Sequence, residues 1–214
     1  MLNIQKFELG PLEACCYIIS TRISSKAVII DPGEETDKII DYINKKKLDP
    51  IILINTHGHG DHIGGNKELK KRYPDIQICV HNDDAEMLTD PYKNLSLLSG
   101  KRYVSPPANR ILNHNDKIMF DEYTFRILHL PGHTSGGIGI YTDSTCNGEA
   151  PVLFSGDTLF AGGIGRTDLP GGSYHLLIQS IKQYIFTLDE NTIIHPGHGS
   201  STTVEVEKER FNFF

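Results

Sequence analysis

The sequence has a small share of basic residues and no long apolar run. Its 21 Lys and Arg against 27 Asp and Glu give a net charge of −6, which disfavours nucleic acid as the main partner. No apolar run approaches the roughly 18 residues that a membrane span needs. Lys6 and Glu8 interrupt the first ten residues, MLNIQKFELG, where a secretion signal would be apolar. We therefore expect a cytoplasmic protein without nucleic-acid or membrane partners.

Cysteine is scarce and its spacing is uninformative for metal binding. Cys15 and Cys16 are adjacent, Cys79 and Cys146 are isolated, and no CxxC spacing occurs. This excludes a zinc knuckle and a secreted disulfide framework. We expect four buried thiols, with one of the two adjacent cysteines facing inward on a strand.

The 214 residues are long enough for one domain with a two-sided core. Short apolar runs bounded by Gly, Pro, Asp and Asn predict strands, and amphipathic segments that begin at Thr36 and Ser173 predict helices. Strands that are apolar throughout need cover on both faces, which indicates an α/β fold with helices outside buried sheets. The nine predicted strands are YIIS, AVIID, PIILINT, DIQICVH, KIMF, TFRILHL, GIGIY, PVLFSGD and TIIHPGH.

The segment THGHGDHIGG, residues 56–65, concentrates His57, His59, Asp61 and His62 within six positions. It follows the predicted strand PIILINT, so these side chains lie at the carboxyl end of a strand, where open α/β sheets bind ligands. Imidazoles and a carboxylate suit a borderline divalent ion such as zinc. Since four ligands on one turn cannot all serve one ion, the segment predicts two ions with further ligands elsewhere.

Three later residues supply these ligands, because each follows an apolar run and lies beside glycine: His133, Asp157 and His198. We assign His57, His59 and His133 to the first ion. The second ion takes Asp61, His62 and His198, and Asp157 bridges the two.

The pattern HxHxDH followed by these three residues resembles the metallo-β-lactamase superfamily. The segments DTLFAGGIGRTDLPGGS and PGHGSSTT resemble its glyoxalase II branch, in particular the short glyoxalase II-like proteins. The resemblance covers nearly the whole chain. It implies the metallo-β-lactamase fold, a four-layer αββα sandwich, with two divalent ions, zinc first and iron or manganese as alternatives, and thioester hydrolysis.

The chain departs from full-length glyoxalase II after His198. Those enzymes continue into a helical domain that holds glutathione, whereas 16 residues follow His198 here. We therefore expect residues 1–214 to form a single hydrolase domain without that helical domain, as a monomer or a small homo-oligomer.

The predicted reaction is hydrolysis of a small-molecule thioester of the S-lactoylglutathione type by a hydroxide that bridges the two ions. Asp61 is also our predicted catalytic residue. Asp31, after the strand AVIID, is the candidate to accept the second N–H of a ligand histidine. Arg166 is the candidate to bind a substrate carboxylate, although an ion pair with Asp168 would explain it equally well.

Other functions share this pattern. A persulfide dioxygenase-like enzyme would use one iron, and other superfamily hydrolases act on small esters, phosphodiesters or β-lactams. A non-catalytic binding module is disfavoured, because a ligand cluster without metal leaves buried polar groups unpaired.

Overall fold

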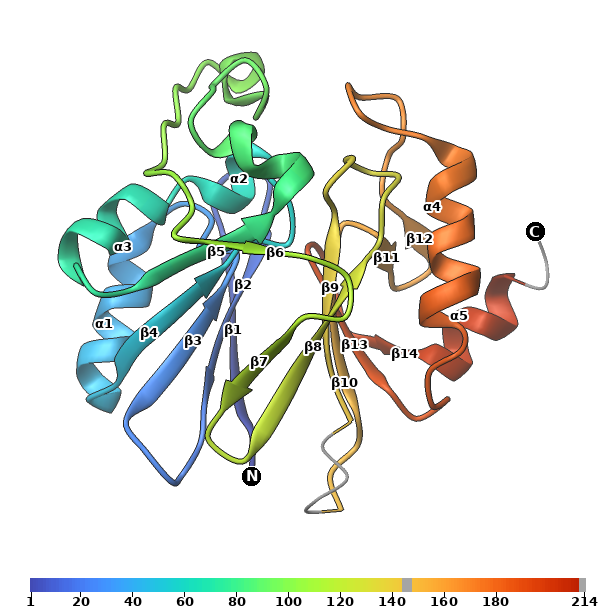
Figure 1. The fold of residues 1–214 in the computed structure, drawn as a ribbon, viewed down its shortest axis with the longest axis horizontal. Helices are drawn as coiled ribbons and strands as arrows, with labels where there is room; N and C mark the ends of the chain where they lie inside the picture. The colour runs from blue at the N-terminus through green and yellow to red at the C-terminus, as the bar shows by residue number, and fades with distance from the viewer. Residues whose placement is uncertain (144–147, 212–214) are drawn as a thin grey trace. The chain divides into compact units, whose positions relative to one another are not determined.

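The computed structural model of the chain describes residues 1–143 and 148–211. Its internal contacts divide it into two units, Met1–Leu112 and Asn113–Phe214. Each unit has its own sheet and helices (Figure 1). Among the described helices, none combines the length and the apolar character that a membrane span requires.

The first unit is built on a mixed six-stranded sheet with the order β1-β2-β3-β4-β5-β6. β1, β2 and β3 pair antiparallel, and β3 to β6 pair parallel. The carboxyl ends of β3, β4 and β5 therefore share one edge, where the loops of this unit's candidate site begin. The strands are β1 (Asn3–Leu9), β2 (Ala14–Ser20), β3 (Lys26–Ile30), β4 (Asp49–Ile54), β5 (Gln77–His81) and β6 (Arg110–Leu112).

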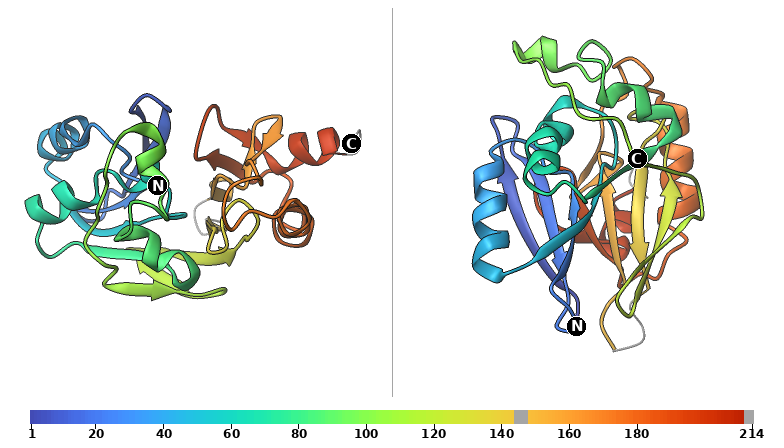
Figure 2. Two further views of the ribbon diagram at one scale, coloured as in Figure 1. Left: turned by 90° about the horizontal axis from the view of Figure 1, so that it is seen from above. Right: turned by 60° about the vertical axis from the view of Figure 1, so that its left-hand side comes forward.

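Helices α1 (Thr36–Lys46) and α3 (Asn66–Arg72) lie on one face of this sheet (Figures 1 and 2). Ile39 and Ile43 of α1 and Leu69 of α3 belong to the same buried apolar cluster as the strand residue Leu53. Three shorter helical segments connect the strands at the site edge: α2 (Gly60–Ile63), η1 (Asn82–Leu88) and η2 (Ser96–Ser99).

The second unit is built on a mixed six-stranded sheet with the order β14-β13-β10-β9-β8-β7. β10 and β13 pair parallel, and the other neighbours pair antiparallel. The strands are β7 (Lys117–Phe120), β8 (Tyr123–His129), β9 (Ile138–Thr142), β10 (Val152–Gly156), β13 (Ile193–Pro196) and β14 (Thr202–Thr203). A separate hairpin joins β11 (Leu159–Phe160) to β12 (Gly163–Ile164).

Helix α4 (Tyr174–Ser180) continues into the π-helix η4 (Ile181–Ile185), and α5 (Val204–Phe211) follows β14. Leu177 of α4 and Ile181 of η4 pack in one buried cluster with Leu153 of β10 and Ile194 of β13. Ser173 caps α4, since its hydroxyl accepts a hydrogen bond from the Leu176 N–H.

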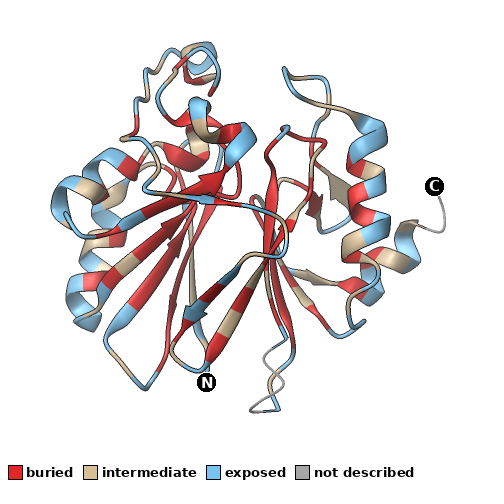
Figure 3. Cartoon of the chain, viewed as in Figure 1, coloured by how far each residue is buried: buried red, intermediate tan, exposed pale blue. Residues whose placement is uncertain are grey.

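All nine predicted strands are confirmed, and the central ones are buried along their length (Figure 3). The prediction of buried thiols is confirmed for Cys15, Cys16 and Cys79, and Cys16 belongs to the apolar cluster of the first unit. Burial raises the pKa of the Cys15 and Cys16 thiols and raises that of Cys79 to about 11, which makes them poor nucleophiles. Cys146 lies outside the described residues.

Candidate metal centre

The ligand loop, residues 56–65, runs from the end of β4 through α2. His57 and His59 are buried, with 2% and 6% of their surface exposed, and their ring centroids are 4.8 Å apart. Asp61 and His62 lie on α2, where Asp61 Oδ2 is 3.6 Å from His62 Nε2. The loop thus holds the four predicted ligands of this unit within one short segment.

Asp31 organises two histidines of the ligand loop. Its carboxylate accepts hydrogen bonds from the Thr56 N–H at 2.7 Å and the Thr56 hydroxyl at 2.6 Å, and lies 3.1 Å from His62 Nδ1. Because the Thr56 hydroxyl donates to Asp31, it accepts from His57 Nδ1, 3.1 Å away. Both rings therefore carry their proton on Nδ1, and Nε2 keeps the lone pair with which a histidine can bind a metal ion. Asp31 itself is 1% exposed and adopts a left-handed backbone conformation, with φ of 48°.

Two contacts that sequence reasoning missed hold the backbone of the ligand loop. The buried carboxylate of Asp84, on η1, accepts the Gly58 N–H at 2.9 Å. Asn55 and Asn66 exchange side-chain hydrogen bonds at 2.8 and 3.3 Å across the ends of the loop. The sequence NDD at residues 82–84 gave no signal that distinguished Asp84 from its exposed neighbour Asp83.

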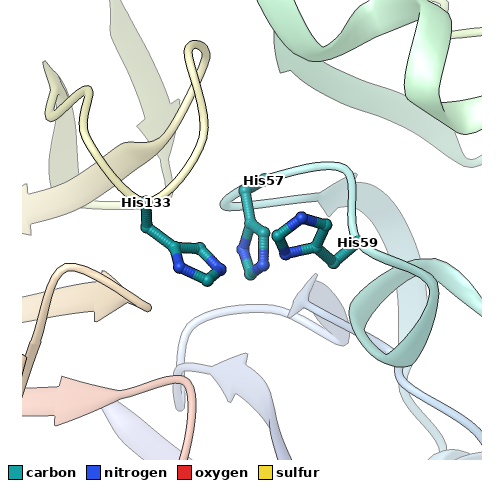
Figure 4. A group of neighbouring side chains, drawn as sticks. All are labelled: His57, His59 and His133. Atoms are coloured by element: carbon teal, nitrogen blue, oxygen red, sulfur yellow. The ribbon is translucent and has the colours of Figure 1, made fainter. Parts of the chain in front are cut away.

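The second unit places its three predicted ligands on loops after three strands: His133 after β8, Asp157 after β10 and His198 after β13. Asp157 Oδ2 lies 3.5 Å from His133 Nε2 and 3.6 Å from His198 Nε2. His133 Nδ1 lies 2.8 Å from the Arg166 carbonyl oxygen, which can only accept, so this ring also keeps its lone pair on Nε2. Figure 4 shows the side chains of His57, His59 and His133, each with its loop.

The Arg166 side chain forms an ion pair with Asp168. Nε and Nη2 donate to the two carboxylate oxygens at 2.8 and 2.9 Å, in the bidentate geometry that guanidinium favours. The hydrogen bond from Arg166 lowers the pKa of Asp168, and the hydrogen bond to Asp168 raises that of Arg166. Both side chains are more than half exposed, at 61% and 71%, so this pair stabilises the fold little.

The donors of both units fit a metal ion. His57, His62 and His133 each hold a hydrogen-bond acceptor at Nδ1 and present a neutral Nε2, which is the arrangement of ligand histidines in metalloproteins. The carboxylates of Asp61 and Asp157 lie beside such nitrogens within their own units. These buried clusters of histidine and aspartate are of the kind that a dinuclear centre requires.

The comparison with known families agrees with this chemistry. Residues 9–201 match the metallo-β-lactamase superfamily. The chain belongs to this superfamily. Over 97% of its length it is 36% identical to the hydroxyacylglutathione hydrolase GloC of Haemophilus influenzae, and the match covers 95% of GloC. The chain is accordingly a metal-dependent hydrolase of the superfamily.

Two solved structures of superfamily members are similar to the chain. The B3 metallo-β-lactamase BLEG-1 is 33% identical, with a TM-score of 0.89 and 97% of each chain covered. TTHA1623, solved in a di-iron-bound form, is 32% identical, with a TM-score of 0.84 and coverage of 98% and 100%. The predicted metallo-β-lactamase fold, with two mixed sheets flanked by helices, is confirmed.

Proposed function

We propose that this metallo-β-lactamase superfamily protein hydrolyses a small-molecule thioester of the S-lactoylglutathione type. Two divalent ions would be held by seven side chains: His57, His59, Asp61, His62, His133, Asp157 and His198. Zinc is our first choice of metal. Iron is supported by the di-iron form of TTHA1623, and manganese stays an alternative.

The similarity to GloC is the observation that supports a hydroxyacyl thioester as the substrate. It extends over nearly the full length of both chains, so it includes the ligand loop of the first unit and the strand-end loops of the second. Burying a polar imidazole as deeply as those of His57 and His62 costs free energy that interactions of the ring nitrogens must offset. A metal ion would supply such an interaction, which supports a metal centre at these residues.

Hydrogen bonds within the chain hold three of the proposed ligand histidines with Nε2 unprotonated. Asp31 and Thr56 fix the protons of His62 and His57 on Nδ1, and the Arg166 carbonyl does the same for His133. When bound, two divalent ions supply Lewis acidity, which polarises a carbonyl and makes water acidic enough to act as a nucleophile near neutral pH. A thiol leaving group has a pKa near 8.5, so the reaction needs no strong general acid from the chain.

The proposal is tested by following loss of the thioester absorbance of S-D-lactoylglutathione with purified, metal-loaded protein. We expect turnover that a chelator abolishes and that added zinc, iron or manganese restores. A preparation with two ions per chain and no turnover would refute the thioesterase. One iron per chain would favour a persulfide dioxygenase-like enzyme instead.

The similarity to BLEG-1 favours β-lactam hydrolysis as a second candidate, since an activated water attacks an acyl carbon in both reactions. The same preparation is therefore assayed with a chromogenic cephalosporin. If kcat/KM were higher for the cephalosporin than for the thioester, β-lactam hydrolysis would become the first candidate.

Arg166→Ala tests the predicted role of Arg166 in binding a substrate carboxylate. We expect KM to rise about tenfold, with kcat and Tm nearly unchanged, because the substitution keeps the carbonyl that accepts from His133. Asp168→Ala is the matched control: it removes the ion pair but leaves the guanidinium free to bind substrate. An unchanged KM in Arg166→Ala would leave the ion pair as the sole role of the Arg166 side chain.

A further inference from the structure

A cavity of about 260 Å³ opens in the first unit beside the ligand loop. Its wall begins at Ile63 and Gly64, which directly follow the predicted ligand His62. The opposite side comes from a segment of the η2–β6 connection. The lining residues are Ile63, Gly64, Lys67, Arg102, Tyr103, Val104 and Ser105.

The charges of this cavity are all positive. Lys67, on α3, and Arg102 are both exposed, and neither makes a side-chain hydrogen bond or ion pair within residues 1–143 and 148–211. The nearby carboxylate of Glu34 is already engaged by Lys101, and that of Glu68 lies 3.9 Å from Lys71. Two cations that face one cavity without a counter-charge form a site for an anion.

The backbone that carries Arg102 is held on both sides, because the Lys101 N–H donates to the Ser96 carbonyl at 3.0 Å and Tyr103 is bound through both of its backbone groups. The Tyr103 N–H donates to the Ser96 hydroxyl at 3.0 Å, and the Asn94 side chain donates to the Tyr103 carbonyl at 3.0 Å. Ser105 is 4% exposed, and its hydroxyl accepts from the Asn66 amide at 3.0 Å. Since Asn66 pairs with Asn55, the cavity wall and the ligand loop belong to one hydrogen-bonded structure.

We propose that this cavity binds a carboxylate of the thiol carrier in the thioester substrate, an inference that rests on the proposed thioesterase function. The planar guanidinium of Arg102 suits a carboxylate, and Lys67 adds a second charge. The volume is below that of pockets which enclose a whole drug-sized ligand, so it accommodates one end of the carrier. A peptide thiol such as glutathione, whose ends carry carboxylates, has the required chemistry.

The test compares S-lactoylglutathione with the neutral S-lactoyl-N-acetylcysteamine. In the variant Lys67→Met/Arg102→Met, we expect the ratio of the two kcat/KM values to fall about tenfold or more, through the KM for S-lactoylglutathione. The matched control Lys71→Met/Arg72→Met removes the same charges from α3 outside the cavity lining and should keep the ratio. An equal fall in the control, or an equal effect on both substrates, overturns the proposal.

A second measurement separates this site from the reaction. Calorimetry with S-methylglutathione, which cannot be hydrolysed, should give a Kd about tenfold weaker for Lys67→Met/Arg102→Met than for the wild type. Equal Kd values overturn the cavity assignment even if thioester turnover is found, and a difference supports it even if turnover fails. If the variant weakens only a coenzyme A thioester, the anion is a phosphate and the carboxylate assignment is wrong.

Discussion

Replacement of Asp157 by alanine is expected to reduce thioester turnover more than about 100-fold, beyond the loss typical of residues that only support a ligand. The carboxylate lies within 3.6 Å of His133 Nε2 and His198 Nε2, so its removal takes away the group shared by the two predicted ligand histidines of its unit. The metal content should fall below two ions per chain. Steady-state kinetics and elemental analysis of the purified variant measure the two effects.

Asp143→Ala is the control for this substitution, because it removes an exposed carboxylate from the same unit just after β9. It should keep both the metal content and kcat. If Asp157→Ala bound two ions per chain and turned over normally, the bridging role of Asp157 would be excluded.

Asp31→Asn is expected to weaken metal binding about 10–100-fold and to lower kcat in parallel. Asparagine tolerates the left-handed backbone of Asp31, so the turn is preserved while the charge and one acceptor oxygen are lost. Asp31 Oδ2 accepts from both His62 Nδ1 and the Thr56 hydroxyl, and Oδ1 accepts from the Thr56 N–H, so the amide nitrogen of asparagine would face at least one of these donors. Metal titration against a chromogenic chelator measures the loss of metal affinity. The Tm of the metal-free protein measures separately any effect of the substitution on the stability of the fold.

Asp121→Asn provides a matched comparison, since Asp121 shares the φ of 48° in the turn between β7 and β8. It should leave the metal affinity unchanged. Equal metal affinity in Asp31→Asn and the wild type would show that the contacts of Asp31 serve the fold alone.

The central strands could be predicted because burial on both faces makes them apolar throughout. YIIS lies within the fully buried β2, and PVLFSGD contains the fully buried β10, and such runs need no tertiary information to be recognised. The helix that begins at Ser173 was equally clear, because a capping serine precedes an apolar stripe.

The edge strands could not be predicted in this way. β1 is an edge strand, and Gln5, Lys6 and Glu8 interrupt its apolar pattern because one side of the strand has no partner. β6 and β14, at other edges, have only three and two residues, too short for a period to show. The first helix begins at Thr36 as predicted, but its N-cap is Glu35, in a left-handed conformation that apolar periodicity does not reveal.

The ligand loop could be found in the sequence because its spacing keeps four side chains within one turn whatever the fold. The contact of Asp84 with Gly58 depends instead on η1 lying against the loop, where a side chain at position 58 would collide with Met87. The hydrogen bonds from His57 through Thr56 to Asp31 join the ligand loop to the end of β3 through a hydroxyl, and hydroxyls carry no recognisable spacing.

The amide pair between Asn55 and Asn66 makes the ligand loop a closed ring. Opening that ring would remove both of these hydrogen bonds and leave the buried amide groups of Asn55 and the side-chain oxygen of Asn66 without them, at about 1–3 kcal/mol for each group left unsatisfied. The conformational entropy of bringing the loop's ligands together is therefore lost when β4 and α3 fold, before any ion arrives. The first unit thus resembles a preorganised macrocyclic chelator, whose donors need little rearrangement when an ion binds.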